Sequence, residues 1–130
     1  MSLCGSCTMC CKLLGIPELE KPATVWCTHC DIGKGCRIYD DRPADCQTYT
    51  CVWRSFKEDG YPVPDELRPD RCGAIVDAAA DGSGHYVRVD PMKPDAWRKA
   101  VVQQFIQRFF SVGEVWLVCG NHLRTLKNLN

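Results

Sequence analysis

Residues 4–11 read Cys-Gly-Ser-Cys-Thr-Met-Cys-Cys, and this stretch governs what the first half of the chain can form. Cys4, Cys7 and Cys10 are each separated by two residues, and Cys11 follows directly. Two cysteines at that spacing let a tight turn direct both sulfurs at one metal ion. On an extended segment, adjacent cysteines point to opposite sides. Cys10 and Cys11 therefore indicate either more than one metal ion or a turn at this point.

The same pattern continues as far as residue 51. Cys27 and Cys30 repeat the two-residue spacing, and three more cysteines follow them. One such pair alone is weak, but two pairs with five further cysteines in residues 4–51 are strongly typical of a metal-binding site. Nine thiolates exceed the four ligands of one tetrahedral zinc, so they suit two zinc ions or a bridged cluster. The predicted metal ligands are Cys4, Cys7, Cys10, Cys11, Cys27, Cys30, Cys36, Cys46 and Cys51.

Composition separates metal binding from disulfide pairing. The 130 residues suffice for one domain, and the 16 basic residues equal the 16 acidic ones. No charge excess is available to attract nucleic acid or an anionic membrane. We see no signal peptide and no apolar run near the roughly 18 residues that span a membrane. We therefore expect a cytoplasmic protein, where disulfides seldom persist. The odd count of 11 cysteines points the same way.

Zinc, as two ions, is the predicted metal, and an iron–sulfur cluster is the alternative. The spacing of Cys4, Cys7 and Cys10 matches the start of the bacterial ferredoxin run, whose fourth cysteine precedes a proline. Here no cysteine precedes a proline, so a fourth ligand would have to come from the later cysteines. Sulfur ligation alone does not separate the two metals. A thiol-based redox sensor that uses Cys10 and Cys11 is a third hypothesis.

Several other residues are assigned from their surroundings in the sequence. His29 lies between two cysteines and is interpreted as a bystander, because thiolates are already abundant. Cys72 and Cys119 lie outside the cluster and are predicted to be core residues, since a free cysteine packs as a small hydrophobic side chain. Four basic residues close in sequence are candidates to offset thiolate charge, and a solvated surface position is the alternative for each, since Lys and Arg are mostly exposed. They are Lys12, Lys34, Arg37 and Arg42.

The fold expected from these patterns is a single α+β domain over residues 1–130. Frequent Gly and Pro in residues 1–55 predict a loop-rich cysteine module, which metal would stabilise. Residues 56–130 are expected to form a small sheet with one helix. Prolines in residues 54–72 indicate a connector without a long helix.

The second half is expected to have β-β-α-β order. Residues 74–76 and 85–89 alternate as strands around a turn at residues 81–84, with Val87 and Val89 facing the core and Arg88 facing water. A helix is expected to begin at Pro94 and to end at Gly113, since an apolar stripe recurs every three to four residues between them. A last buried strand is expected at residues 115–118, followed by a polar tail from Asn121.

Three segments together resemble a known family. They are the run from Cys4 to Cys11, the sequence Gly-Cys-Arg-Ile-Tyr at residues 35–39, and Arg42-Pro43 followed by Cys46. They resemble the CxxCxxCC family, bacterial proteins described as zinc- or iron-chelating. The resemblance covers roughly residues 4–51, and it implies metal binding by the nine N-terminal cysteines. We assign Tyr39 and Arg42 to the surroundings of the metal ligands, and an aromatic core residue beside a surface arginine is the alternative. One branch of the family, the flagellin lysine methyltransferases, carries a similar cluster in much longer chains.

The leading hypothesis from the sequence is a metal-ion-binding protein without enzymatic activity. Its role would be structural, in an interaction with an unidentified protein partner, or in metal handling. The alternative is an iron–sulfur protein with a redox or methyl-transfer role. We find no Ser-His-Asp order and no paired catalytic carboxylates in an identifiable pocket, so catalytic residues are not assigned.

Overall fold

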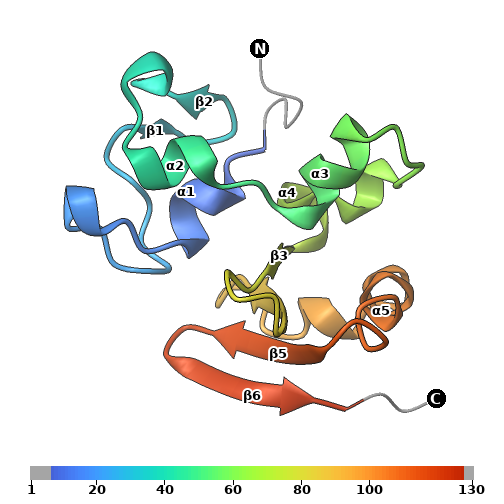
Figure 1. Cartoon of the computed structure of the whole chain (residues 1–130). Helices are drawn as coiled ribbons and strands as arrows, with labels where there is room; N and C mark the ends of the chain where they lie inside the picture. Colours follow the sequence, from blue (N-terminus) through green and yellow to red (C-terminus); the bar gives the residue numbers. More distant parts are fainter. Residues whose placement is uncertain (1–6, 128–130) are drawn as a thin grey trace.

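The computed structural model describes residues 7–127, so Cys4 lies outside the described residues. The described chain combines short helices with a two-stranded antiparallel sheet and a four-stranded mixed sheet. The predicted α+β class is confirmed. Figure 1 shows the cysteine-rich segment to one side of and above the larger sheet.

The larger sheet is built from the second half of the chain. Its strands run in the order β3-β4-β5-β6, with β4 and β5 parallel and the two outer pairs antiparallel. A parallel pair needs a crossover, and a helical segment supplies it between β4 and β5. The bounds of the strands are β3 Ala74–Ala78, β4 Gly84–Val89, β5 Glu114–Cys119 and β6 His122–Leu126.

The crossover helix is shorter than the sequence predicted. A 3₁₀ turn, η4 (Ala96–Arg98), precedes the helix α5 (Ala100–Gln107), because Lys99 between them is extended. The helix then ends before Gly113, which has a different role. A Cβ atom at Gly113 would lie 2.5 Å from the carbonyl oxygen of Ser83, so this glycine lets β5 start against the end of the preceding turn.

The predicted polar tail is wrong, since it contains the edge strand β6. Cys119 pairs with His122, which leaves a two-residue hairpin loop of Gly120 and Asn121. Gly120 has a φ of 60°, a conformation that glycine adopts without strain. The second half therefore has the order β-β-α-β-β.

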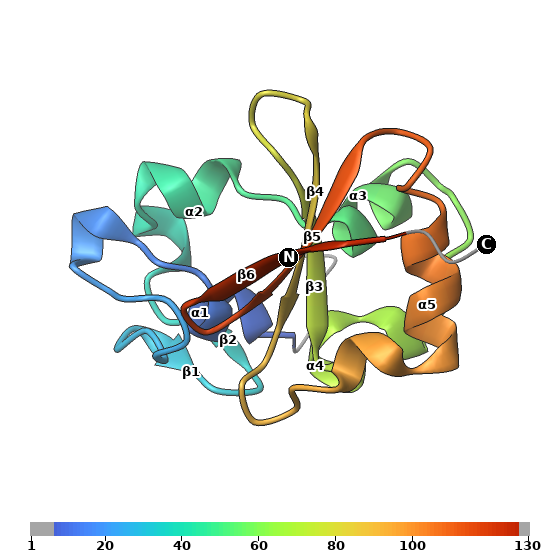
Figure 2. The same cartoon turned by 90° about the horizontal axis from the view of Figure 1, so that it is seen from below.

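Alternation along β4 sets the two faces of this sheet. Val87 and Val89 are 0% and 1% exposed, as predicted, and they pack towards α5. On α5, Val102, Phe105 and Ile106 are buried at the spacing of one helical face. Viewed from below in Figure 2, α3, α4 and α5 lie on one side of the strands, and α1, α2, β1 and β2 lie on the other.

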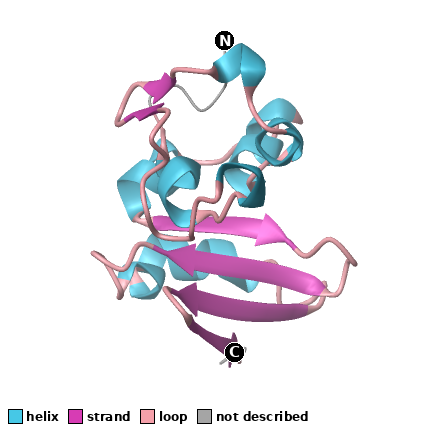
Figure 3. Ribbon diagram, turned by 90° about the vertical axis from the view of Figure 1, so that its left-hand side faces the viewer, coloured by secondary structure: helices cyan, strands magenta, loops and turns pink. Residues whose placement is uncertain are grey.

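The cysteine-rich half consists of loops and very short elements, as predicted. Its two strands hold two residues each, and no helix among residues 7–51 exceeds five residues. In Figure 3 the small hairpin lies far from the large sheet, with helices between them. The elements are α1 Met9–Leu13, η1 Pro17–Leu19, β1 Cys30–Asp31, β2 Gly35–Cys36, η2 Tyr39–Asp41 and α2 Ala44–Thr48.

The connector packs against the sheet and α5. It forms α3 (Val52–Glu58), η3 (Asp65–Leu67) and α4 (Pro69–Cys72), all short, as its prolines predicted. Trp53 is 4% exposed and donates its indole N–H to the Pro64 carbonyl oxygen at 3.0 Å. Met9 and Leu13 of α1 belong to the same buried cluster as the strands and α5. The cysteine-rich half therefore shares a core with the sheet.

In the part of the chain that the structure describes, every helix is too short or too polar to cross a membrane.

Candidate metal centre

The first cysteine motif is carried by the short helix α1. Because Cys10 and Cys11 are helical, they point about 100° apart, as neighbours on a helix do, and not to opposite sides. Their side chains are hydrogen-bonded to each other. The sequence indicated either more than one metal ion or a turn at this pair of cysteines. The structure has a helical turn there.

Backbone hydrogen bonds bring the second motif to the first. The Cys27 N–H donates to the Cys11 carbonyl oxygen at 2.9 Å, and the Cys30 N–H donates to the Cys27 carbonyl oxygen at 3.0 Å. The second bond closes the tight turn that the two-residue spacing allows. The hairpin of β1 and β2 then places Cys36 directly opposite Cys30.

The third group of cysteines follows Arg42-Pro43. Pro43 precedes α2, and its carbonyl oxygen accepts the Cys46 N–H at 2.9 Å. Cys51 lies at the start of α3 and is 8% exposed, where it joins the buried cluster shared with the sheet. Cys51 therefore lies where the cysteine-rich half meets the buried cluster of the sheet.

The cysteines surround one cavity of about 970 Å³. Cys30 is 6% exposed and does not line the cavity, but its side chain is hydrogen-bonded to those of Cys11 and Thr8. Eight of the nine predicted ligands therefore lie in one region, and Cys4 is outside the described residues. The cysteines that line the cavity are Cys7, Cys10, Cys11, Cys27, Cys36, Cys46 and Cys51.

Thiol acidity differs sharply within this group. A hydrogen bond from Cys11 lowers the pKa of Cys10 to about 7, against the opposing effect of burial. The same hydrogen bond, together with burial, raises the pKa of Cys11 well above its usual value. Burial also raises the pKa of Cys30 and of Cys46. The thiolate of Cys10 is thus favoured near neutral pH. Cys11, Cys30 and Cys46 need a further positive charge nearby to lose their protons.

Lys21 supplies a buried positive charge that sequence analysis missed. The residue is 8% exposed, and its ammonium donates to the carbonyl oxygens of Lys12 at 3.1 Å, Pro22 at 3.0 Å and Leu14. Two of these acceptors lie at the end of α1, so Lys21 holds the helix that carries Cys10. Burial lowers the pKa of Lys21, whereas the thiols of Cys27 and Cys11 oppose that shift.

The four basic residues predicted to surround the cluster have different positions. Arg37 donates to the carbonyl oxygens of Thr28 and Cys30, at 2.8 Å and 3.4 Å. Lys34 is exposed at the cavity wall. Lys12 instead forms an ion pair of 2.8 Å with Asp90, which ties α1 to the end of β4.

Arg42 and Tyr39 lie together at the cavity, as the sequence suggested. Arg42 donates to the carbonyl oxygens of Tyr39 at 2.8 Å and Cys46 at 3.4 Å. Its guanidinium lies 3.9 Å from the centre of the Tyr39 ring. The positive charge of Arg42 also favours the Cys10 thiolate. The arginine therefore braces the loop before Cys46 through carbonyl groups.

Another part of the cavity wall is polar and comes from the sheet and from Tyr49, which follows α2. Tyr49 donates its hydroxyl to Asp77 at 2.9 Å, and Arg88 donates to the same carboxylate through Nε at 2.8 Å and Nη2 at 3.3 Å. Arg88 was expected to face water, but it is half-buried at the cavity because the cysteine-rich half covers this face of the sheet. The register of the β3–β4 hairpin contained the signal, since it places Asp77 and Arg88 on one face.

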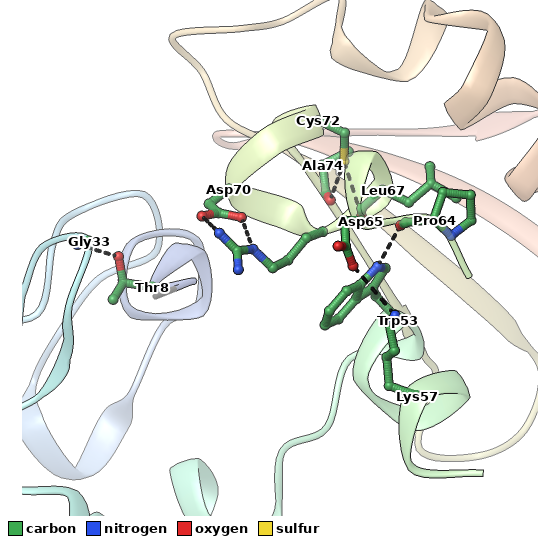
Figure 4. Close-up of polar contacts among 11 residues, drawn as sticks. Thr8, Gly33, Trp53, Lys57, Pro64, Asp65, Leu67, Asp70, Cys72 and Ala74 are labelled. Carbon is green, nitrogen blue, oxygen red and sulfur yellow. Dashed lines mark hydrogen bonds and ion pairs between the residues drawn. The ribbon is translucent and has the colours of Figure 1, made fainter. Parts of the chain in front are cut away.

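Polar contacts also hold the edges of this region (Figure 4). The hydroxyl oxygen of Thr8, a residue 4% exposed, accepts the Gly33 N–H at 3.1 Å and so links α1 to the β1–β2 hairpin.

Cys72 is 3% exposed, and its sulfur lies 3.3 Å from the Ala74 carbonyl oxygen, so the predicted core position is confirmed. Cys119 is only partly buried at the end of β5. His29 is partly buried, and its carbonyl oxygen accepts the Arg37 N–H.

The side chains around the cavity fit a thiolate-bound metal in their chemistry, since seven of them are cysteines. The cysteines with free thiols include Cys10, Cys11, Cys27, Cys30, Cys36 and Cys46. Among residues 7–127, no three His, Cys, Asp or Glu side chains are close enough to form a ligand group for one ion. The cysteines thus line a shared cavity without forming a compact ligand group.

No family model matches the chain, and no similar curated protein or solved structure was found.

Proposed function

We propose that the protein binds metal, zinc in first place, through its N-terminal cysteine cluster. The observation that carries the proposal is the cavity, because seven cysteines that are scattered over residues 7–51 in the sequence line one space. Free thiols suit the reducing cytoplasm that the sequence suggests. We also propose that the protein belongs to the CxxCxxCC family, which its cysteine motifs resemble.

The thiols that would hold a first ion are Cys10, Cys11 and Cys30, since their side chains are already hydrogen-bonded in series. Cys27 interacts electrostatically with Cys30, and Cys46 with Cys10. Cys36 lies opposite Cys30 in the hairpin. A bound zinc stabilises thiolates and crosslinks the loops that carry them. Lys21 and Arg42 favour the charged form of the sulfurs and hold the backbone on which they lie.

This arrangement favours a closed site without enzymatic activity. A structural zinc site fills every coordination position with protein ligands, and the cysteines here outnumber those positions. The role that follows is to stabilise a surface for a partner protein, or to hold and transfer metal.

An iron–sulfur cluster is the second candidate, and the width of the thiol group favours it. In a tetrahedral zinc site, with Zn–S bonds of about 2.3 Å, the sulfurs lie about 3.8 Å apart. The described cysteines do not form so compact a group. A cluster with its own sulfides reaches cysteines that are more widely spaced, and redox or methyl-transfer activity would then become the leading function.

The test is the metal and sulfide content per chain, with an absorption spectrum, on protein purified without oxygen and without added metal. Zinc at about two ions per chain and no visible absorbance is the expected result. Iron with sulfide would support the second candidate. Protein that is folded but contains neither would contradict both.

A matched pair of variants connects the result to these residues. Cys10→Ser with Cys30→Ser removes two thiols from the hydrogen-bonded series, and we expect the loss of at least one ion per chain. Cys119→Ser removes a thiol at the far end of β5 and should leave the metal content unchanged.

A further inference from the structure

The cavity is larger than a metal centre requires. Its volume of about 970 Å³ is near the upper end of the roughly 300–1,000 Å³ typical of small-molecule sites. The cysteines line only one part of it. One part of the remaining wall is formed by Ile75 and Asp77 of β3, Tyr86 and Arg88 of β4, and Tyr49. This wall has a chemistry of its own.

Arg88 is the group on this wall that is oriented for a ligand. Asp77 is 6% exposed and accepts two hydrogen bonds from Arg88, through Nε and Nη2. Tyr49 donates to the same carboxylate, and the Tyr86 ring lies 4.8 Å from the guanidinium. The side chain is therefore held in one position from two directions.

One edge of the guanidinium is left for another acceptor. An arginine has five N–H donors in a rigid fork, and Asp77 uses the Nε edge. Among residues 7–127, the hydrogen-bond acceptor for the Arg88 side chain is Asp77. The other edge is formed by Nη1 and Nη2. Arg88 is one of the residues that line the cavity.

We propose that the cavity binds a small organic carboxylate, whose carboxylate group pairs with the outer edge of the Arg88 guanidinium. A carboxylate matches this edge because its two oxygens accept two parallel N–H bonds. Asp77 offsets the charge of Arg88, so recognition depends on the fork geometry more than on net charge. The apolar part of the ligand packs against the half-buried ring of Tyr86. Ligand binding at this wall goes beyond metal binding and does not depend on which metal the cysteines hold.

Benzoate is the probe, because it combines a carboxylate with a flat apolar ring. Titration into the protein as purified, followed by amide and arginine side-chain NMR signals, should give saturable shifts at Arg88 and Tyr86. The expected dissociation constant is about 1 mM, which is ordinary for so small a ligand. Benzamide has the same shape without the charge and should bind at least tenfold more weakly.

Arg88→Lys keeps the positive charge but removes the fork, and we expect it to weaken benzoate binding at least tenfold. Arg98→Lys is the matched control, since Arg98 is exposed on η4, and it should change nothing. If Arg88→Lys does not fold, the map of benzoate shifts on the unaltered protein decides the matter. Shifts that lie away from Arg88, equal binding of benzamide, or no saturable shift would overturn the proposal.

Metal content measured on the same sample separates the two proposals. Metal-free folded protein that binds benzoate at Arg88 would contradict metal binding alone. Metal-loaded protein without benzoate binding would contradict this inference alone.

Discussion

The two halves of the molecule are stabilised in different ways. All six of its largest fully buried side chains belong to the half with the sheet. In the cysteine-rich half, two of the buried side chains, Thr8 and Lys21, are polar, and several of the others are cysteines. The fully buried side chains are Ile75, Val87, Val89, Val102, Ile106 and Val115.

This difference indicates what each half requires in order to fold. The sheet half buries apolar side chains between β3–β5 and α5, and that burial offsets the entropy of ordering the chain. The cysteine-rich half has helices of at most five residues and relies on hydrogen bonds to loop carbonyl groups. Under the proposed function, a metal crosslink would supply the stabilisation that this half lacks.

The largest expected effect of a single substitution lies in the sheet half. Ile106→Ala leaves a cavity beneath α5 and should lower the free energy of unfolding by about 3 kcal/mol. Chemical denaturation measures it, with Val112→Ala as the control because Val112 is 63% exposed. The metal content of the folded variant should not change. A loss of metal in protein that is still folded would break the separation between the halves.

In the cysteine-rich half, the matching substitution is Lys21→Met. It removes a buried ammonium and leaves three carbonyl oxygens without that donor, so we expect about 2.5 kcal/mol of local destabilisation. Amide exchange should quicken in α1 while β3–β5 stay protected. Lys34→Met, at an exposed position, is the control. Equal loss of protection in both halves would contradict a local role.

The ion pair between the halves should give a pH-dependent contribution. Burial alone would raise the pKa of Asp90, but hydrogen bonds from Lys12 and from the Met92 amide outweigh it and hold the pKa below its usual value. A carboxyl group whose pKa is lower in the folded state stabilises the fold above its unfolded pKa of about 3.9. That stabilisation is lost as the pH falls through the folded pKa.

Asp90→Asn should therefore cost about 1.5 kcal/mol at pH 7. The difference from the unaltered protein should shrink in acid below about pH 4, where Asp90 itself becomes protonated. Denaturation at a series of pH values measures the difference. A difference that stays constant into acid would show that the charge of Asp90 has no part in joining the halves.

The smallest expected effect is at the second tie between the halves. Burial and the charge of Asp77 raise the pKa of Tyr49, so its hydroxyl stays protonated and donates to Asp77. Tyr49→Phe removes that hydrogen bond alone and should cost about 1 kcal/mol. Thermal unfolding measures the change, with Tyr61→Phe as the control on an exposed ring. An unchanged midpoint would mean that this contact does not join the halves.

Much of the sheet half could be predicted from the sequence, because alternation and helical spacing report burial directly. Val87, Val89 and the stripe on α5 are examples. The strand β6 was missed because its side chains are mostly exposed, and an edge strand need not show an apolar pattern. The two-residue Gly120-Asn121 turn was the signal that marked it.

In the cysteine-rich half, spacing predicted which thiols gather but not what surrounds them. Lys21 stands beside Pro22 in a loop, and no sequence pattern shows that its ammonium is buried beneath α1. The wall formed by Tyr49, Asp77 and Arg88 depends on how one half lies over the other. Such contacts between distant segments are set by tertiary packing, which local patterns do not encode.

Amide hydrogen exchange before and after metal removal by a chelator tests the central claim most directly. If metal stabilises the cysteine-rich half, chelation should remove protection from α1, the β1–β2 hairpin and α2, and most of the protection in β3–β5 and α5 should remain. Protection that stays unchanged in both halves after the metal has been removed would contradict the claim.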